Sequence, residues 1–502
     1  MIRSIGILSV MAVVICSQNV SQGDDVSWPQ FRGAESSGVV HMDLPIQFAP
    51  GTNQRWEMEI PPGHSSPVVH GNKIFLTTYD RQAPSVGVLC IDRIKARLLW
   101  RRDTPVQQLE KGHPSFDPAS STACCDDDSV VAYFGSHGIL CYDHQGNKQW
   151  EKTFPVATSF GGNAASPILH GDSVVLYRGT YTDHFLLCLD RKTGDEKWRV
   201  EQSEKFTGEM ACTACPIVVG EKLICHTARS VQCYDVNTGE QIWIAKCATT
   251  ATSTPVLARD ERGSPSEVLV AAWNKLGEPD LRPPFPSFDE LLQQHDANDN
   301  QRIERNEFPR LWIFHRPEGI EAAMNGAPVG WKHANKNGDA SIEREEWSRT
   351  VKGLEKFRSG YETHGLIAIP IDSEGFVSAE NVRTLITDGI PEVPSPIIHA
   401  GQCYLVKNGG LLTRIDIASG RRTARLRTRG RGTHYASPLV AGDHLYTFAG
   451  DGRVSVIDLT DEKLRIVAVN EMPDKVYATP AIAGNTLYLR THQKLYAFAN
   501  LE

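Results

Sequence analysis

The sequence has few long runs of apolar residues, and the most pronounced run lies near residue 1. Residues Ile5 to Ile15 form this run, which is too short for a transmembrane helix of about 20 residues. One arginine precedes it and a polar stretch ending in small residues follows, so residues 1–23 are predicted to be a signal peptide cleaved before Asp24. We expect a periplasmic or secreted mature chain without a transmembrane segment. Lipoprotein anchoring at Cys16 is not expected, because Ile15 stands where that signal needs a small residue.

Positive charge is also scarce. Lys and Arg total 52 against 60 Asp and Glu, which gives a formal net charge of -8, and the two signs are interspersed. Such a chain has no broad positive field, so nucleic acid is excluded as its main partner. The composition, 40% hydrophobic and 22% charged, is that of a globular protein. We expect a monomer whose partner is a protein or another component of the cell envelope.

The sequence lacks a recognisable catalytic set. No Ser, His and Asp and no zinc ligands stand at a spacing that identifies a site, so no catalytic residue is predicted and a non-enzymatic role is favoured. Cys212 and Cys215 have the spacing of a redox pair, but Pro216 follows them and their surroundings are β-patterned. Redox chemistry is not expected there, because no helix is present to lower a thiol pKa.

The cysteines are placed regularly. Twelve cysteines less Cys16 leave eleven, so at least one cannot pair within the mature chain. Four of them stand two residues before an Asp, in the phrases LCID, LCYD, LCLD and QCYD: Cys90, Cys141, Cys188 and Cys233. A small apolar side chain at one point of a repeat indicates a strand residue that faces the core.

An internal repeat dominates the remaining sequence. Phrases such as SSPVVHGNKIFLTTY and ASPLVAGDHLYTFAGDG share a Pro-apolar start, a turn and an alternating strand, and Asp, Gly and Trp follow in the next two strands. Trp recurs at intervals of about 45 to 50 residues. Eight starts are present, near Ser66, Thr122, Ser166, Cys215, Thr254, Ser395, Ser437 and Thr479.

Four strands per repeat predict an all-β fold, an eight-bladed β-propeller. The last repeat ends without a Trp strand, while NQRWEMEI near the N-terminus is a lone strand containing Trp56, so this strand is predicted to complete the last blade. The first part of the propeller is assigned to residues 24–275, a helical insertion in the fifth blade to 284–358, and the second part to 359–502.

The phrases LDRKTGDEKW and YDVNTGEQIW resemble the docking repeat of PQQ-like β-propeller proteins, and WPQFRG at Trp28 to Gly33 resembles the opening of a secreted bacterial subgroup. The resemblance implies the fold and leaves two functions open: a non-enzymatic scaffold like that of outer-membrane barrel assembly, or a PQQ-dependent quinoprotein oxidoreductase using the axial cavity. The adjacent Cys124 and Cys125 suggest the second. They align with the first strand of a repeat, however, and the Glu, Asn and Asp of quinoproteins are not found in matching contexts, so PQQ is not expected.

The insertion begins with a helix signal, because Ser287 and Glu290 form a capping-box pattern. Trp347, Val351, Leu354 and Phe357 lie at helical spacing further on. Two segments between these points match the oxygen-ligand positions of a calcium-binding helix-loop-helix, with Arg302 and Ser341 contributing backbone carbonyls. The first set is Asp296, Asn298, Asn300, Arg302, Glu304 and Glu307; the second is Asn335, Asn337, Asp339, Ser341, Glu343 and Glu346.

This arrangement resembles a paired EF-hand with unusual loops. The sixth residue, usually Gly, is Gln301 in one loop and Ala340 in the other, and a non-Gly residue forced to positive φ costs about 1 kcal/mol. We therefore expect weak Ca²⁺ binding, at about 10⁻⁴ to 10⁻³ M. The alternative is a metal-free pair held by contact between Ile303 and Ile342. The leading hypothesis is a secreted calcium-binding scaffold.

Two charged series have simpler interpretations. Seven Asp residues precede the same turn and are predicted to bind their own backbone: Asp92, Asp143, Asp190, Asp235, Asp372, Asp416 and Asp458. The phrase GRRTARLRTRGR gathers six arginines between Arg421 and Arg431. A solvated outer strand is favoured for it, and an anion site for an acidic glycan or a phosphate-bearing surface is the alternative.

Overall fold

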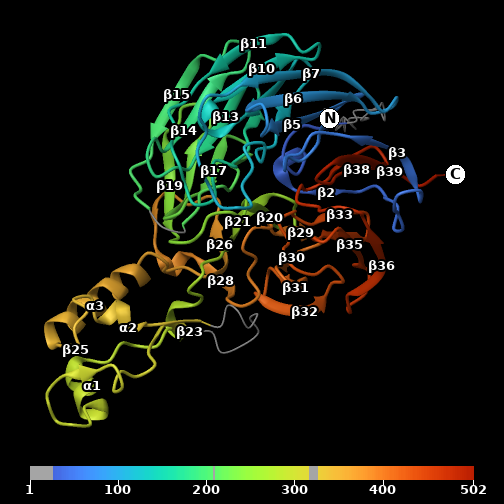
Figure 1. Ribbon diagram of the computed structural model, residues 1–502. Coiled ribbons are helices and arrows are strands. Elements are labelled where there is room, and N and C mark those ends of the chain that lie inside the picture. The colour runs from blue at the N-terminus through green and yellow to red at the C-terminus, as the bar shows by residue number, and fades with distance from the viewer. Residues whose placement is uncertain (1–26, 207–209, 316–325, 502) are drawn as a thin grey trace, which may run out of the picture.

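The computed structural model describes residues 27–206, 210–315 and 326–501, so the predicted signal peptide lies outside the described residues. Eight sheets follow one another around a ring, and a small helical insertion projects from one side (Figure 1). The predicted eight-bladed β-propeller is confirmed. Within the described ranges, no helix has both the length and the apolarity needed to cross a membrane.

The first four blades follow one another directly along the chain. Blade 1 contains β1 (Ser27–Trp28), β4 (Val68–His70), β5 (Lys73–Asp80), β6 (Ser85–Asp92) and β7 (Arg97–Pro105). Blade 2 contains β8 (Cys124–Cys125), β9 (Ser129–Tyr133), β10 (Ile139–Asp143) and β11 (Lys148–Lys152). Blade 3 contains β12 (Ile168–His170), β13 (Ser173–Arg178), β14 (Phe185–Asp190) and β15 (Glu196–Glu201). Blade 4 contains β16 (Ile217–Val219), β17 (Lys222–His226), β18 (Ser230–Asp235), β19 (Gln241–Lys246) and β27 (Gly375–Val377).

The remaining blades include the insertion point and the N-terminal strands. Blade 5 contains β20 (Val256–Arg259), β21 (Pro265–Ala272), β26 (Gly365–Pro370) and β28 (Arg383–Ile386). Blade 6 contains β29 (Ile397–His399), β30 (Gln402–Lys407), β31 (Leu411–Asp416) and β32 (Arg421–Arg427). Blade 7 contains β2 (Val39–Val40), β33 (Leu439–Ala441), β34 (His444–Phe448), β35 (Arg453–Asp458) and β36 (Arg465–Glu471). Blade 8 contains β3 (Gln54–Glu59), β39 (Lys494–Phe498), β38 (Thr486–Arg490) and β37 (Ala481–Ala483).

Burial along the strands explains the sequence pattern. The two middle strands of a blade are buried on both faces because neighbouring blades cover them, as in β13 and β14. The outer strand alternates between half-buried and exposed residues, as in β3. The eleven cysteines from Cys90 to Cys403 are all buried free thiols, which confirms that the repeated cysteines face the core.

The recurring Trp residues join five of the blades to the next one. Trp100 Nε1 donates to the backbone carbonyl of His144 at 3.0 Å, and Trp150 Nε1 donates to that of Arg191 at 2.9 Å. A glycine of the next turn packs on each indole. A Cβ on Gly146, whose φ is +82°, would lie 2.8 Å from the Trp100 ring. The Asp-Gly turn and the Trp strand of the repeat are therefore halves of one inter-blade contact.

The ring closes with strands from both ends of the chain. The N-terminal strand β3 pairs with β39, which confirms the prediction that the Trp56 segment completes the last blade (Figure 1). Figure 1 shows this blue strand beside the red C-terminal strands. The edge strand β27, which leaves blade 5 and pairs in parallel with β19 of blade 4, was not predicted.

The strand order gives the ring two distinct faces. Each inner strand begins on one face and ends on the other, so every connection into an inner strand lies on the first face. Because neighbouring strands in a blade are antiparallel, the connections from the second to the third strand lie there too. We call this the entry face. The helical insertion joins β21 to β26, the second and third strands of blade 5, and therefore leaves the propeller from the entry face.

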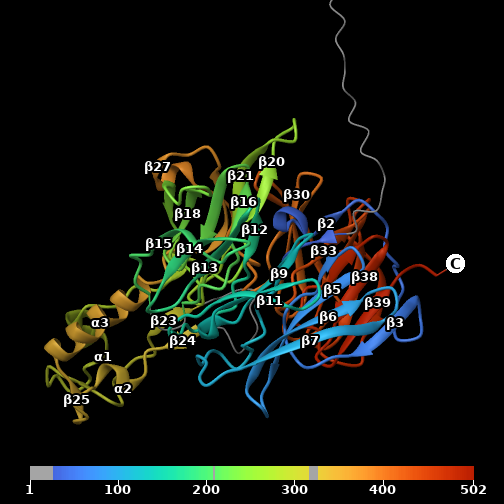
Figure 2. The ribbon, with the colours of Figure 1, turned by 90° about the horizontal axis from the view of Figure 1, so that it is seen from above.

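The described residues of the insertion form three helices and two small sheets. Figure 2 shows the insertion extending away from the ring. The helices are α1 (Phe288–His295), α2 (Trp331–Ala334) and α3 (Arg344–Arg358). One sheet pairs β22 (Ile303–Glu304) with β25 (Ser341–Ile342), and the other pairs β23 (Trp312–His315) with β24 (Gly326–Pro328). Among the described residues, the short 3₁₀ helices are η1 (Ala34–Ser36), η2 (Gly135–His137), η3 (Pro279–Leu281) and η5 (Ala379–Asn381).

The structure confirms part of the local pattern that the sequence predicts for the insertion. Ser287 Oγ accepts from the Glu290 amide and Glu290 accepts from the Ser287 amide, as the capping-box pattern predicted. Ile303 stands opposite Ile342, and Trp347 is buried between the helices. Phe357 is an exception. It is 38% exposed, because α3 leaves the insertion core before its last turn.

Candidate functional site

The eight repeat starts form a ring around the propeller axis. Each contributes a small hydroxyl or thiol side chain, and each is at least nine-tenths buried: Ser66, Thr122, Ser166, Cys215, Thr254, Ser395, Ser437 and Thr479. Seven hydrogen bonds of 2.9 to 3.2 Å run from the backbone amide of one member to the side chain of the next, in chain order. The repeat thus uses Ser and Thr at this point to tie neighbouring blades together.

A cavity of about 210 Å³ lies inside this ring. Its walls come from the ring members and from the connections that precede the inner strands on the entry face. These connections differ in length and sequence between blades, and they contribute His64, His113, Phe116, Phe160, Thr252, Glu392, Tyr435 and Tyr477. Sequence reasoning missed these residues because they lie outside the repeated phrase.

The polar groups of the cavity are joined in a short chain. His113 Nδ1 lies 2.8 Å from Ser115 Oγ, and the pKa of Tyr435 is raised by burial although a hydrogen bond to Ser115 acts in the opposite direction. Tyr435 packs edge-on against Tyr477, with ring centroids 5.2 Å apart. Burial lowers the pKa of His64 to about 4, so this imidazole is neutral at physiological pH. The cavity therefore offers hydroxyls, aromatic faces and the neutral imidazole of His64.

The N-terminal phrase WPQFRG closes the opposite end of the axis. Trp28 pairs with Val69 at the far end of an inner strand, and the carbonyl of Pro29 accepts from the Cys125 amide at 2.8 Å. Phe31 reaches the cavity and forms part of its lining.

Arg32 anchors this plug. Its guanidinium is fully buried and donates to the carbonyls of Ser37 and Pro396, the second at 2.7 Å. Burial lowers the pKa of Arg32 to about 10, so it stays charged at neutral pH. Gly38 is required beside it, because its φ is +72° and a Cβ would lie 3.2 Å from Nε of Arg32. The phrase resembling a subgroup signature is thus a structural plug.

The cavity does not fit the quinone cofactor that PQQ-like propellers imply. PQQ is a polycarboxylate, yet the described lining residues include no Lys or Arg, and their one carboxylate is Glu392. Cys124 and Cys125 lie in β8, pair with β9 and are buried free thiols. The pKa of the Cys215 thiol is raised by burial, which disfavours thiolate chemistry at the Cys212 and Cys215 pair.

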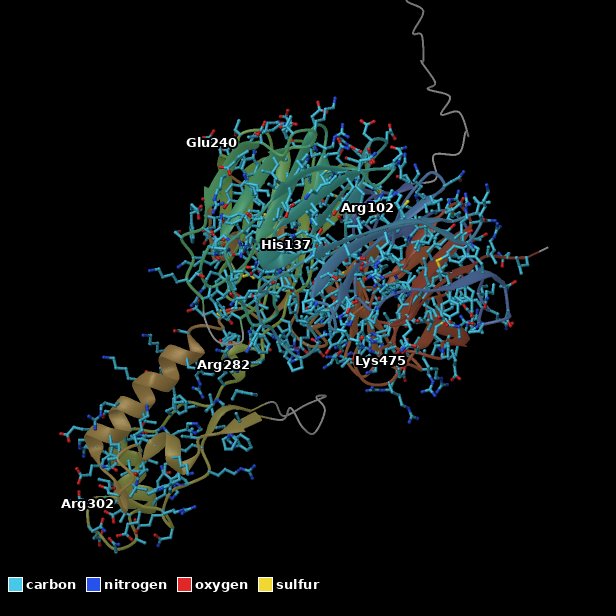
Figure 3. All side chains as sticks on the ribbon, turned by 45° about the horizontal axis from the view of Figure 1, so that its top comes forward. Arg102, His137, Glu240, Arg282, Arg302 and Lys475 are labelled. Atoms are coloured by element: carbon cyan, nitrogen blue, oxygen red, sulfur yellow. The ribbon has the colours of Figure 1, made fainter. Side chains whose placement is uncertain are left out.

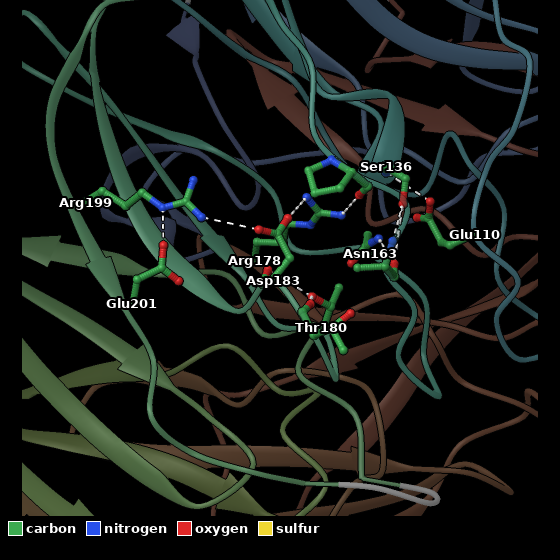
Figure 4. A network of polar contacts seen from close by, with 11 residues as sticks. Glu110, Ser136, Asn163, Arg178, Thr180, Asp183, Arg199 and Glu201 are labelled. Carbon is green, nitrogen blue, oxygen red and sulfur yellow. Dashed lines mark hydrogen bonds and ion pairs between the residues drawn. The ribbon is translucent and has the colours of Figure 1, made fainter.

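A polar network fixes the segment that carries His113 and Ser115 (Figure 4). Glu110 accepts from the Ser136 amide at 2.9 Å, and the Ser136 hydroxyl accepts from the Ala157 amide at 3.1 Å. Asn163 donates to the Ala157 carbonyl at 3.1 Å. These bonds attach the segment before blade 2 to the loops beside it, so their role is to position the cavity wall.

Arg178 and Asp183 form the buried part of the same region (Figure 4). Arg178 is 1% exposed, stacks on Phe154 and Phe185, and donates to Asp183. Asp183 also accepts from Arg199 at 3.3 Å. Asp183 therefore pairs with both arginines, and these ion pairs stabilise the turn between β13 and β14 of blade 3.

The first loop of the insertion brings its predicted ligand residues together around backbone amides. Asp296 Oδ2 accepts from the Gln301 amide at 2.8 Å, and Glu307 accepts from the amides of Ala297 and Glu304 at 3.0 and 2.9 Å. Gln301 has φ +62°, so the predicted strain at the sixth position is present.

The other predicted positions of the first loop occupy its open side. Asn298 accepts from the Asn300 amide at 3.1 Å, and Asn300 donates to Glu304 at 3.0 Å. Arg302, whose carbonyl is the predicted seventh ligand, extends its side chain to Glu343 of the second loop at 3.0 Å. Figure 3 shows Arg302 at the far end of the insertion.

The second loop is folded differently at one position. Asn337 accepts from the Asp339 amide and Asp339 accepts from the Ser341 amide, both at 3.0 Å. The left-handed residue is Gly338, with φ +77°, and Ala340 lies outside the left-handed region. The expected strain at Ala340 was therefore wrong, because the glycine two residues earlier makes the turn.

Glu346 closes this second loop and has an unsatisfied oxygen. It is 5% exposed, and its Oε1 accepts from the amides of Lys336 and Asn337 at 2.7 and 3.2 Å. Its Oε2 is buried without a hydrogen-bond partner among the described residues. Asn335 lies beside it, 5% exposed, with Nδ2 donating to the Asp339 carbonyl at 2.8 Å. A buried carboxylate oxygen without a partner is costly unless a cation or water meets it.

The carboxylates of both loops are not yet gathered into a closed site. In the part of the chain that the structure describes, no three His, Cys, Asp or Glu side chains converge closely enough to hold a metal ion. Asn side chains and the carbonyls of Arg302 and Ser341 would have to supply several ligands. Calcium binding by the two loops therefore stays a prediction, and a cation would have to draw the carboxylates inward.

Comparison with known proteins identifies the family. A family model described as outer membrane protein assembly factor BamB matches residues 49–245 and 376–502, which is more than half of the chain. The chain belongs to this family of PQQ-like propellers. The two matched segments flank the insertion. A search of curated proteins finds no match.

Solved structures support the fold. BamB from Moraxella catarrhalis is 11% identical, with a TM-score of 0.51, over 89% of this chain and 97% of that one. A europium-containing methanol dehydrogenase is 10% identical, with a TM-score of 0.59, over 95% and 98%. A quinohemoprotein alcohol dehydrogenase from Comamonas testosteroni is 12% identical, with a TM-score of 0.54, over 95% and 81%. At these identities the likeness shows the fold alone.

Proposed function

We propose that this protein is a secreted or periplasmic, non-enzymatic propeller scaffold whose insertion is an EF-hand pair that binds Ca²⁺. The observation that carries the proposal is Glu346, a buried carboxylate with one oxygen held by two backbone amides and the other without a partner among the described residues. This is the place of the final bidentate ligand in a calcium loop.

The metal sites would be completed by movement of the remaining ligands. In the first loop these are Asp296, Asn298, Asn300, Glu304, Glu307 and the carbonyl of Arg302, and in the second they are Asn335, Asn337, Asp339, Glu343 and the carbonyl of Ser341. We expect weak affinity, at about 10⁻⁴ to 10⁻³ M, because Gln301 is strained and Asn335 removes a charge. Such an affinity suits the calcium concentrations met outside the cytoplasm.

The proposed scaffold role rests on the position of the insertion. It leaves from the entry face, and its base packs on the propeller, with Tyr361 and Leu276 in the apolar cluster shared by blades 3 and 4. Arg282, at the junction in Figure 3, donates to the carbonyl of Gly277 at 2.9 Å and to that of Tyr361. Calcium would order the outer loops on this fixed base and present them to a protein or cell-envelope partner. The cavity lining gives the quinoprotein alternative no support.

Calorimetric titration of Ca²⁺ into chelator-treated mature protein tests the proposal. Glu346→Gln keeps the amide contacts of this side chain but removes its charge, and Glu307→Gln does the same in the first loop. Glu345→Gln is the matched control, because this exposed residue on the same helix is not a predicted ligand. We expect saturable binding that each of the first two variants reduces and the control retains.

Two further measurements distinguish the calcium-binding scaffold from a metal-free insertion and from a quinoprotein. About 10 mM Ca²⁺ should stabilise the insertion by about 1.4 to 2.7 kcal/mol at the expected affinities. An absorbance spectrum of the same sample should show no quinone band. Absence of calcium heat in wild type would refute the metal assignment, and a quinone band would refute the non-enzymatic assignment.

A further inference from the structure

A second pocket on the entry face gathers arginines at the rim between blades 6 and 7. Its lining includes Arg427, Arg429 and Arg431, which follow one another along the end of β32 and the next connection, and Arg453 at the start of β35. We call it the arginine pocket. Its volume is about 640 Å³. This concentration of positive charge stands out in a chain with a net charge of -8.

Two of the four guanidinium groups are not used by the fold. Arg427 donates to the Gly409 carbonyl at 2.8 Å, and Arg453 pairs with Asp451 and Glu471. Arg429 and Arg431 have no side-chain hydrogen bond or ion pair with any described residue; only their backbone amides are bonded, at 3.0 and 2.9 Å. Both side chains are exposed. Their charge is therefore available to a ligand.

The floor of the pocket contains an unsatisfied hydroxyl. Thr428 lines the pocket and is 4% exposed, yet its Oγ1 has no hydrogen-bond partner among the described residues. Its backbone amide is fixed by the Gly410 carbonyl at 2.8 Å, so the side chain is held in place. A buried hydroxyl without a partner costs about 1 to 3 kcal/mol unless something meets it.

Two glycine-containing turns form the floor of the pocket. The Gly409 amide donates to the Gly432 carbonyl at 2.8 Å, which joins the two turns beneath the arginines. Gly432 has φ +77°, and a Cβ on Gly430 would lie 2.3 Å from the Ala449 side chain. Neither glycine tolerates a side chain at low cost, so no side chain from these two positions fills the space beside the arginines.

The lining also discriminates between kinds of anion. The only apolar side chain among the described lining residues is Val469, which is 40% exposed, so nothing is present to insert into a bilayer. The acidic Glu471 and the negative net charge disfavour a densely charged nucleic acid. Guanidinium donors around one aliphatic patch suit a sugar that carries carboxylate or sulfate groups.

We propose that the arginine pocket binds an acidic glycan, with Arg429 and Arg431 contacting its oxyanions above the floor formed at Thr428. This assignment is independent of calcium binding by the insertion. It gives a function to the arginine-rich phrase, whose first part serves the fold: Arg422 and Arg425 both pair with Asp388.

Binding to immobilised polygalacturonate and to a heparin fragment tests the proposal on the full mature chain, with neutral dextran as the blank. We expect binding that weakens as ionic strength rises. Arg429→Gln with Arg431→Gln should weaken it about tenfold or more, because hydrogen bonds to charged groups are the strong ones. Arg421→Gln with Arg422→Gln is the matched control, since it removes the same charge from β32, outside the pocket.

Val469→Trp separates a shaped site from a diffuse field. It fills the pocket at an exposed lining position and keeps all charges, so it should weaken glycan binding at every ionic strength without changing the salt dependence. Equal losses in the pocket variant and the control would overturn the proposal, as would binding to dextran. Binding to anionic phospholipid vesicles or nucleic acid with none to either glycan would overturn the glycan assignment. Far-ultraviolet circular dichroism confirms that each variant is folded.

Discussion

The ring of hydrogen bonds around the axis predicts that a single small substitution weakens the whole propeller. In Ser395→Ala the Thr254 amide loses its acceptor, which lies 3.1 Å away. Both residues are at most 2% exposed, so the orphaned amide is buried. Leaving a buried donor unsatisfied costs about 1 to 3 kcal/mol, far more than the lost oxygen contributes by packing. We therefore expect Ser395→Ala to lower the free energy of unfolding by at least about 1 kcal/mol.

Urea unfolding followed by Trp fluorescence measures this effect, because the inter-blade Trp contacts break with the fold. Ser395→Thr is the retention control, since Thr stands at the same point of the repeat in three other blades. Ser264→Ala, in an exposed turn, is the blank, expected within about 0.5 kcal/mol of wild type. Hydrogen exchange at the Thr254 amide should accelerate only in Ser395→Ala. If Ser395→Ala matches Ser264→Ala in stability and Thr254 keeps its protection, the ring is not a source of stability.

Three other consequences can be measured. Burial lowers the pKa of His184 and His226 to about 4, below about 6.5 in the unfolded chain, so the unfolded state binds more protons between these values and stability falls as pH falls. Each should cost about 2 kcal/mol at pH 5 relative to neutral pH, and His226→Gln should remove its share of the pH dependence in urea titrations. All eleven described thiols are buried, so a thiol reagent should label none in the native protein and all after unfolding. Trp347→Ala should lower the free energy of unfolding of the insertion by about 3 to 5 kcal/mol. The indole is 1% exposed and also donates to the Pro286 carbonyl at 2.9 Å. Protease should therefore cut the insertion of this variant while the propeller core resists.

The repeating parts of the fold could be predicted because each repeated residue has the same physical task in every blade that contains it. Ser, Thr and Cys at the repeat starts accept the amide of the preceding blade, and Trp and Gly form the contact between blades. Asp190 accepts from the amides of Lys192 and Thr193 at 2.9 and 3.0 Å, which is the turn that the recurring Asp predicted. A pattern that recurs in eight repeats can be recognised in a single sequence.

The parts of the fold that occur only once in the chain could not be predicted in the same way. The plug of Trp28 to Arg32 spans several blades, and no local periodicity reveals contacts that are distant in sequence. The cavity walls come from connections of unequal length, so Tyr435 and His113 stand at no common position. In the insertion, spacing identified the ligand residues, but the turn at Gly338 could not be distinguished from one at Ala340.

One connection belongs to both the axial cavity and the arginine pocket, which makes a further prediction about their coupling. Residues 428–437 line the pocket at Thr428 and the cavity at Tyr435. Asn408 holds this connection, because its Oδ1 accepts from the His434 amide at 2.8 Å and its Nδ2 donates to Glu392 of the cavity wall at 3.1 Å. A glycan that orders Thr428 should therefore slow hydrogen exchange as far as Tyr435. In Asn408→Ala the glycan should still bind, but the protection should stop before His434. Unchanged protection at Tyr435 in that variant would mean that the backbone alone transmits the effect, and no protection in wild type would mean that the two sites are independent.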